Sequence, residues 1–193
     1  MRTTRRVWLL SPLLVLSLLL GQSWAPAEVG NGSCVSGTQP CDGNTGDIGS
    51  TSCNGDFACL ANSGKIRNNA CTGDSACADN GGPVDKHSCN GVGACEANSG
   101  DIDRNSCNGT AACNANSGEI GSGSCQGFSA CFENSGEVGN NSCQGEAACF
   151  ENSGNIGNGS CNGDYACPNN TLTIGSGRCN VSPEKLPCHS PNP

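Results

Sequence analysis

The chain has 193 residues and a net charge of −8, with 18 cysteines, 29 glycines and only 4% aromatic residues. So few large side chains cannot fill an ordinary globular core, and chains of this kind replace hydrophobic burial with disulfides, which predicts an oxidising compartment and therefore export. The acidic charge argues against nucleic acid or an anionic membrane surface as a partner.

The first 27 residues have the pattern of a secretory signal peptide. Arginines between residues 2 and 6 form a basic start, an apolar run follows at 7–20, and the small residues at 25–27 permit cleavage before Glu28. A membrane anchor is the alternative, but the run is shorter than the roughly 20 residues of a membrane span. We therefore expect a signal peptide at 1–27 and a secreted mature chain without a membrane partner.

An 18-residue repeat fills the rest of the chain. The unit reads C-N-G-x-x-A-C-x-x-N-S-G-x-I-G-x-x-S, without insertion or deletion between Cys41 and Cys179. Such a strict period indicates units that stack on copies of themselves, and the unit is too short for a helical hairpin of roughly 33 residues. The sequence predicts an all-β fold, a disulfide-laddered β-solenoid (β-helix) of about eight coils over residues 28–188. A proline-rich C-terminal tail follows at 189–193.

Columns of similar residues run through the repeat and predict its interior. Isoleucine or valine recurs once per unit and should form a narrow apolar spine. Two glycine columns, which include Gly46 and Gly55, are expected to supply the positive φ angles of tight corners. An asparagine column, from Asn44 to Asn170, has two interpretations that stay open. Its amides are either bonded from coil to coil or engaged in local turn chemistry alone.

The cysteines permit two regular pairing schemes, one within each C-x5-C step and one across the longer gap between steps. The second scheme leaves Cys34 and Cys188 at opposite ends of the rod, although a disulfide needs Cα atoms within about 7 Å. The first scheme leaves no cysteine over, so we predict rungs within coils. The predicted pairs are Cys34–Cys41, Cys53–Cys59, Cys71–Cys77, Cys89–Cys95, Cys107–Cys113, Cys125–Cys131, Cys143–Cys149, Cys161–Cys167 and Cys179–Cys188.

Metal binding is the rival interpretation. Zinc sites usually show closer cysteine spacing and often histidine, whereas this chain has only His87 and His189. We expect no metal and no cofactor. A column of acids could form a structural Ca²⁺ ladder, but the glycine-rich nonapeptide of such ladders is missing and a solubilising edge is the favoured interpretation. The column comprises Glu28, Asp47, Asp101, Glu119 and Glu137, with Asp85 and Asp103 two residues further along the unit.

The repeat resembles that of the short-coil antifreeze solenoids of beetles, which also place a cysteine pair at this spacing in every coil. The resemblance covers residues 28–188 as architecture and implies the same rungs inside coils and the same small core residues. The beetle coils are shorter and present T-C-T on a flat ice-binding strand. This chain has S-C-N, S-C-Q or A-C-T there.

The residues that flank the first cysteine of each unit predict a polar lattice, because neighbours of an inward-pointing strand residue point outward. A lattice of this kind is what binding to ice or crystalline polysaccharide requires, although stacked amides could instead simply stabilise the ladder. The candidate face comprises Ser88, Asn90, Ser106, Asn108, Ser124, Gln126, Ser142, Gln144, Ser160 and Asn162.

Three phenylalanines form a candidate apolar patch. Phe132 and Phe150 occupy one column in successive units, and Phe128 is close by. If exposed, they could bind sugar rings or a second rod; the alternative is that two of them cover a corner.

No catalytic motif is present. His87 stands alone in its column, and no phosphate loop, nucleophile elbow or zinc-binding H-E-x-x-H occurs. We therefore expect a secreted protein that is not an enzyme and acts as a structural or surface-interaction element. An ice- or polysaccharide-lattice binder is the first alternative and a carbohydrate-active β-helix enzyme the second.

Overall fold

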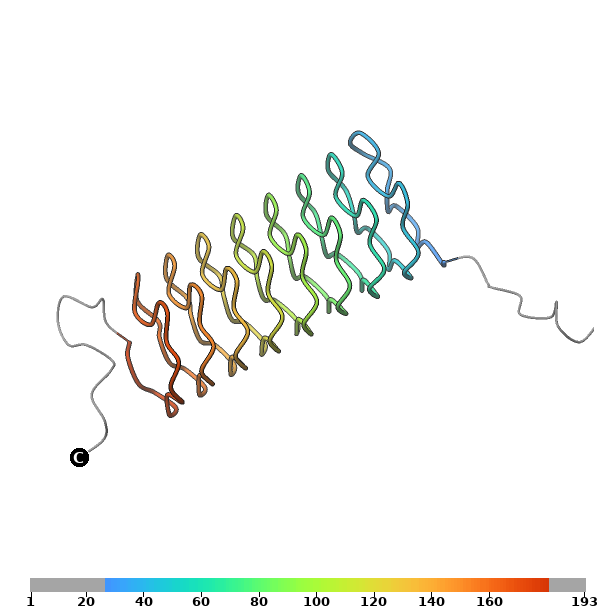
Figure 1. Ribbon diagram of the computed structural model, residues 1–193. Coiled ribbons are helices and arrows are strands. Elements are labelled where there is room, and N and C mark those ends of the chain that lie inside the picture. The colour runs from blue at the N-terminus through green and yellow to red at the C-terminus, as the bar shows by residue number, and fades with distance from the viewer. Residues whose placement is uncertain (1–26, 181–193) are drawn as a thin grey trace, which may run out of the picture.

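The computed structural model describes residues 27–180, which form a rod of stacked coils (Figure 1). The colour changes steadily from blue to red along the rod, so each coil lies between the coils that precede and follow it in the sequence. Residues 1–26 of the predicted signal peptide, the tail 189–193 and Cys188 lie outside the described residues. Residues 27–180 contain no helix, and therefore none that could cross a membrane.

Each coil contributes one aliphatic residue to a ladder of parallel bridges. Ile120 bridges Ile102 in the preceding coil and Val138 in the following one. Its amide nitrogen donates to the carbonyl oxygen of Asp101 at 2.8 Å, and the Gly121 nitrogen donates to that of Val138 at 2.7 Å. The bridging column is Val29, Ile48, Ile66, Val84, Ile102, Ile120, Val138, Ile156 and Ile174.

Within the described residues, β-bridges between coils occur only at this one position per coil, and no strand longer than a single bridge is formed. Four left-handed residues per coil explain this. In one coil, Asn105, Cys107, Ala111 and Ala115 have φ angles of 56°, 56°, 50° and 56°. A left-handed residue cannot continue an extended strand, so each one turns the chain. The β-solenoid class therefore stays a prediction, whereas the stack of 18-residue coils is a property of the structure.

The two glycine columns do not supply these turns. No glycine from Gly46 to Gly154 in one column or from Gly55 to Gly163 in the other has a positive φ, so the role predicted for these columns is wrong. Gly37, which stacks on Gly55 in the first coil, is the exception with a φ of 100°. The two columns instead allow close stacking: a Cβ on Gly100 would overlap the carbonyl oxygen of Gly118 in the next coil. Glycine is required where two backbones approach this closely, and most left-handed positions carry other residues.

The core is a set of narrow columns rather than a globular interior. In one coil Cys107, Ala112, Cys113, Asn116 and Ile120 are all fully buried. The predicted aliphatic spine is confirmed, since residues from Ile48 to Ile174 in the bridging column are at most 7% exposed. Each coil therefore buries one branched aliphatic side chain, and the remaining core volume is filled by sulfur, alanine and amides.

Candidate functional site

Eight disulfides link cysteines within residues 27–180, and every one joins two cysteines of the same coil. The Cys107–Cys113 rung has a Cα–Cα distance of 5.6 Å. This is the pairing that the sequence predicts. Cys179 is also disulfide-bonded, and its predicted partner Cys188 lies outside the described residues. The described rungs are Cys34–Cys41, Cys53–Cys59, Cys71–Cys77, Cys89–Cys95, Cys107–Cys113, Cys125–Cys131, Cys143–Cys149 and Cys161–Cys167.

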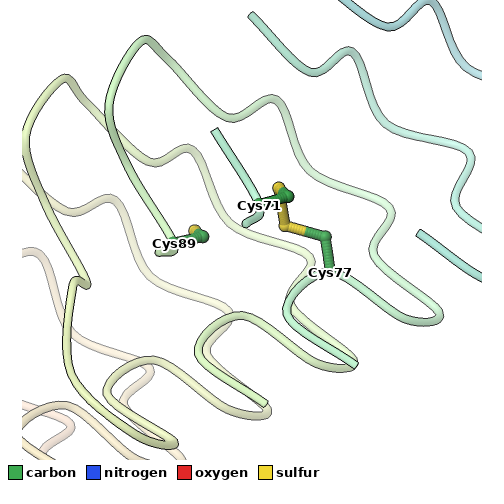
Figure 2. A group of neighbouring side chains, drawn as sticks. All are labelled: Cys71, Cys77 and Cys89. Atoms are coloured by element: carbon green, nitrogen blue, oxygen red, sulfur yellow. A yellow bond between two sulfur atoms is a disulfide. The ribbon is translucent and has the colours of Figure 1, made fainter. Parts of the chain in front are cut away.

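Sulfur atoms also approach each other between coils. The Sγ atoms of Cys71, Cys77 and Cys89 lie within 4.8 Å of one another, and Figure 2 shows the Cys71–Cys77 rung with Cys89 of the next coil beside it. Metal ligation requires thiolates, whereas these sulfurs are joined in disulfides. Two further groups of this kind are Cys107, Cys113 and Cys125, and Cys125, Cys131 and Cys143.

The asparagine column forms a continuous amide ladder that runs from Asn44 to Asn170. The Nδ2 atom of Asn116 donates to Oδ1 of Asn98 at 2.9 Å and to the carbonyl oxygen of Gly118, two residues ahead, at 2.7 Å. The same pair of bonds recurs in the other complete coils. Both interpretations of the column therefore hold together, because each amide bonds the preceding coil and also its own turn.

The serine half of the predicted lattice is buried, and its expected outward orientation is wrong. Ser88, Ser106, Ser124, Ser142 and Ser160 are 0% exposed. Each hydroxyl donates to a backbone carbonyl of the next coil at 2.8–2.9 Å. The prediction assumed strand alternation around the cysteine. Because the first cysteine of every coil is left-handed, the alternation fails there and the serine beside it also points inward.

The amide half of the predicted lattice lies partly at the surface but is used for bonding between coils. Asn108 accepts from the backbone nitrogen of Asn90 at 3.1 Å and donates to the carbonyl oxygen of His87 at 3.0 Å. Asn90 and Asn162 make equivalent bonds, and Gln126 and Gln144 donate to the preceding coil through Nε2. Neither half of the candidate face is therefore left free to match an external lattice.

The candidate apolar patch is smaller than the sequence indicates. The rings of Phe132 and Phe150 are stacked, with centroids 5.2 Å apart and planes 6° from parallel, and both residues are half-buried. Phe128 is 58% exposed and makes no ring contact with either within residues 27–180. Because each ring covers one face of the other, the pair offers less apolar surface to a sugar or to a second rod than two separate exposed rings would.

The side chains of the predicted acidic column, Glu119 and Glu137 among them, are exposed. Asp47 forms an ion pair with Lys65 at 3.8 Å. Within residues 27–180, the groups of three side chains close enough to share a metal ion consist of cysteines. The structure thus does not bring three of these carboxylates together as a Ca²⁺ ladder would require.

One titratable group has a clearly shifted pKa. The Tyr165 hydroxyl donates to Oε1 of Glu146 at 2.7 Å. This hydrogen bond and the negative charge of Glu146 raise the pKa of Tyr165 above its ordinary value of 10.0. His87, the other candidate for chemistry, is exposed, and its imidazole has no partner within the described residues. These two residues are in different coils and form no common site.

The sequence interpretation overlooked a regular column of hydroxyl side chains that are not used for bonding between coils. Its hydroxyls are exposed and have no hydrogen-bond partner within residues 27–180. The signal was available, because the residues one and three positions before the inward-pointing aliphatic residue of each coil alternate outward with it. Two residues further along from the hydroxyls, four coils carry a carboxylate of the acidic column (Asp47, Asp101, Glu119 and Glu137), and the other coils carry Lys65, Pro83, Asn155 or Thr173. The column, which we call the hydroxyl column, consists of Thr45, Ser63, Ser99, Ser117, Ser135, Ser153 and Thr171, with Gly81 in one coil.

Comparison with known proteins gives a family without an assigned function. No curated protein and no solved structure matches the chain, so the likeness to beetle antifreeze solenoids stays a prediction. A family described as a domain of unknown function, DUF7640, matches residues 22–125 and 94–192. The two matches overlap and together cover all the described coils. The chain therefore belongs to the DUF7640 family, and its structure is a ladder of disulfide-closed repeats.

Proposed function

We propose that this protein is a secreted, non-enzymatic β-solenoid rod that acts as a structural or surface-interaction element. The rungs support this proposal, because disulfides persist in an oxidising, extracellular environment. The hydrogen bonds that the polar side chains make between coils are a second support. The serine column, the asparagine column and the amides beside the cysteines all bond coil to coil, so these groups maintain the rod rather than bind a ligand.

The hydroxyl column carries the surface-interaction part of the proposal. It repeats with the period of the coils, interrupted only by Gly81 within the described residues, on a backbone held by parallel bridges. In the coils of Ser99, Ser117 and Ser135 an exposed carboxylate lies two residues further along. A partner that repeats along its own length, such as a polysaccharide chain or a crystalline surface, can contact many coils at once, and such multivalent contact raises affinity without any strong single site. If the protein binds a lattice, the hydroxyl column is therefore the binding face, and the residues beside the cysteines are not.

Binding to insoluble polysaccharides and to ice tests the proposal. The oxidised, full-length protein is incubated with each material, and the bound fraction is measured against a triple variant that blocks the hydroxyl column, Ser99→Tyr, Ser117→Tyr and Ser135→Tyr. A matched triple variant, Val92→Tyr, Thr110→Tyr and Phe128→Tyr, alters another exposed column of the same three coils. The proposal predicts that the first triple loses binding and the second retains it.

Two results would count against this assignment. Equal binding by both variants would show that the hydroxyl column is not the interaction face. An absence of binding to every material, in a chain whose circular dichroism matches an ordered rod, would remove the surface-interaction function and leave only the structural one.

A further inference from the structure

The inner rungs of the ladder are closed to solvent but lie against each other. Cys107, Cys113, Cys125, Cys131 and Cys143 are all 0% exposed. The sulfurs of the first three lie within 4.8 Å of one another, as do those of the last three. Cys125 belongs to both groups, so three consecutive coils share one continuous path of neighbouring sulfur atoms.

We propose that this sulfur path is a thiol–disulfide relay, in which a free cysteine in one coil exchanges with the rung of the adjacent coil. If Cys107 is a thiolate, its sulfur attacks Sγ of Cys125, the Cys107–Cys125 bond forms and the Cys125–Cys131 bond breaks. Cys131 leaves with the electron pair and takes up a proton. The number of thiols is unchanged, and neither an oxidant nor a reductant is consumed.

The bridged intermediate fits the spacing of the coils. Cys107 and Cys125 occupy the same position in successive coils, and parallel-paired segments lie about 4.8 Å apart. This separation falls within the Cα–Cα range of about 4.4–6.8 Å that a disulfide spans. The bridge therefore requires rotation of side chains rather than movement of whole coils.

The released cysteine can repeat the step. Cys131 lies within 4.8 Å of Cys143, so its thiolate can attack that sulfur and release Cys149. A thiol that begins at Cys107 thus reaches the second coil beyond its own. A second, shorter path joins the Cys71–Cys77 rung to Cys89 (Figure 2).

Burial sets the rate of this exchange. An apolar environment raises the pKa of a thiol and lowers its thiolate fraction, so transfer should take minutes to hours, as uncatalysed disulfide rearrangement does. During oxidative folding, the relay would let an unpaired cysteine inside the stack move to another coil instead of remaining where it arose. A reductant in solution meets first the partly exposed cysteines near the ends of the described ladder, Cys34, Cys41 and Cys179.

A single-thiol variant tests the relay. In Cys113→Ala, Cys107 is the one cysteine that loses its partner. The full-length variant is incubated at mildly alkaline pH, quenched with acid, alkylated and mapped by mass spectrometry under non-reducing conditions. We expect alkylation to start at Cys107 and then appear at Cys131 and Cys149, together with a Cys107–Cys125 disulfide. The double variant Cys107→Ala, Cys113→Ala lacks the thiol and should keep every other rung unchanged.

A second single-thiol variant tests whether the result for Cys113→Ala arises from local unfolding of that coil. Cys131→Ala leaves Cys125, whose sulfur contacts cysteines of both neighbouring coils, so alkylation should spread in both directions. Circular dichroism matching the wild-type protein establishes that the coils remain stacked. Alkylation that stays at the original cysteine in both variants would overturn the relay. So would disulfides to coils outside the contacting groups, because these would report unfolding and random exchange.

Discussion

The side-chain amide nitrogen of Asn116 donates a hydrogen bond of 2.9 Å to the amide oxygen of Asn98 in the preceding coil. Both residues are at most 1% exposed, where an unsatisfied polar group is costly and a satisfied one is strengthened by the low dielectric. The bond is one step of a ladder that links the described coils from end to end. Ordered coil stacking therefore depends on polar side chains as well as on the aliphatic spine.

Replacement of Asn116 by alanine should destabilise the rod. The variant loses the bonds to Asn98 and to the Gly118 carbonyl, and it removes the acceptor of Asn134 in the next coil. Buried groups that lose their partners cost about 1–3 kcal/mol each. Denaturant unfolding with the disulfides intact should show a clearly lower midpoint.

Asn114 provides the matched control in the same coil. It is half-buried, and its Nδ2 atom donates to Glu96 at 3.2 Å near the surface. Asn114→Ala should change the free energy of unfolding by no more than about 0.5 kcal/mol, as is usual for surface positions. Equal effects of the two substitutions would contradict a structural role for the amide ladder.

Adjacent glycines give opposite predictions for an added methyl group. A Cβ at Gly82 would overlap the carbonyl oxygen of Gly100, whereas a Cβ at Gly81 would have its nearest neighbour at 3.8 Å. Gly82→Ala should force the coils apart and cost about 1–3 kcal/mol or more. Gly81→Ala should be neutral or slightly stabilising, because it restricts the unfolded chain. Thermal unfolding of the two variants checks the pair, and similar losses in both would refute the stacking explanation.

The sequence predicts the period, the rungs and the aliphatic spine because each depends on a strict repeat that the structure must satisfy in every coil. The corners could not be predicted in the same way. Ala111 and Tyr165 are left-handed, although neither residue type favours that conformation. The column of Asn105, which holds Asn, His or Gly in most coils, is the one left-handed corner whose chemistry gives a signal. Strand alternation around Cys107 predicts that Ser106 points outward, and this prediction is wrong because Cys107 is left-handed. The closed coil, and not the residue type, sets that left-handed φ.

The pKa of Tyr165 predicts a pH dependence that can be measured directly. The chain has one tyrosine, so the ultraviolet absorbance of tyrosinate reports this residue alone. The hydrogen bond to Glu146 should shift its titration above 10.0, and Glu146→Ala should return it toward that value. Because the folded pKa is raised, the stabilising contribution is present below the ordinary pKa and disappears as pH rises through the raised one.

Asp164 supplies the control for this titration, since its charge contributes least to the shift. Asp164→Asn should lower the pKa of Tyr165 less than Glu146→Ala does. A titration that is identical in the wild-type protein and in Glu146→Ala would show that the hydrogen bond is not maintained in solution.

Complete reduction should abolish the ordered rod. Ordering the backbone costs about 1–2 kcal/mol per residue, and each coil buries only one branched aliphatic side chain. Each rung closes a small loop and contributes about 2 kcal/mol, so the ladder stabilises by the number of its rungs. Far-ultraviolet circular dichroism of the reduced and alkylated protein should be that of a disordered chain, and an unchanged spectrum would show that the coils stack without rungs.

The most direct test of the account is non-reducing peptide mapping of the wild-type protein after proteolysis at acidic pH. Closure of every coil by its own rung predicts that Cys107 is linked to Cys113 and Cys89 to Cys95, as in the structure. The resulting peptides contain their disulfide internally, with no link between coils. A peptide that joins Cys95 to Cys107 would show that the rungs bridge successive coils, and would contradict the closed-coil ladder on which the stacking argument rests.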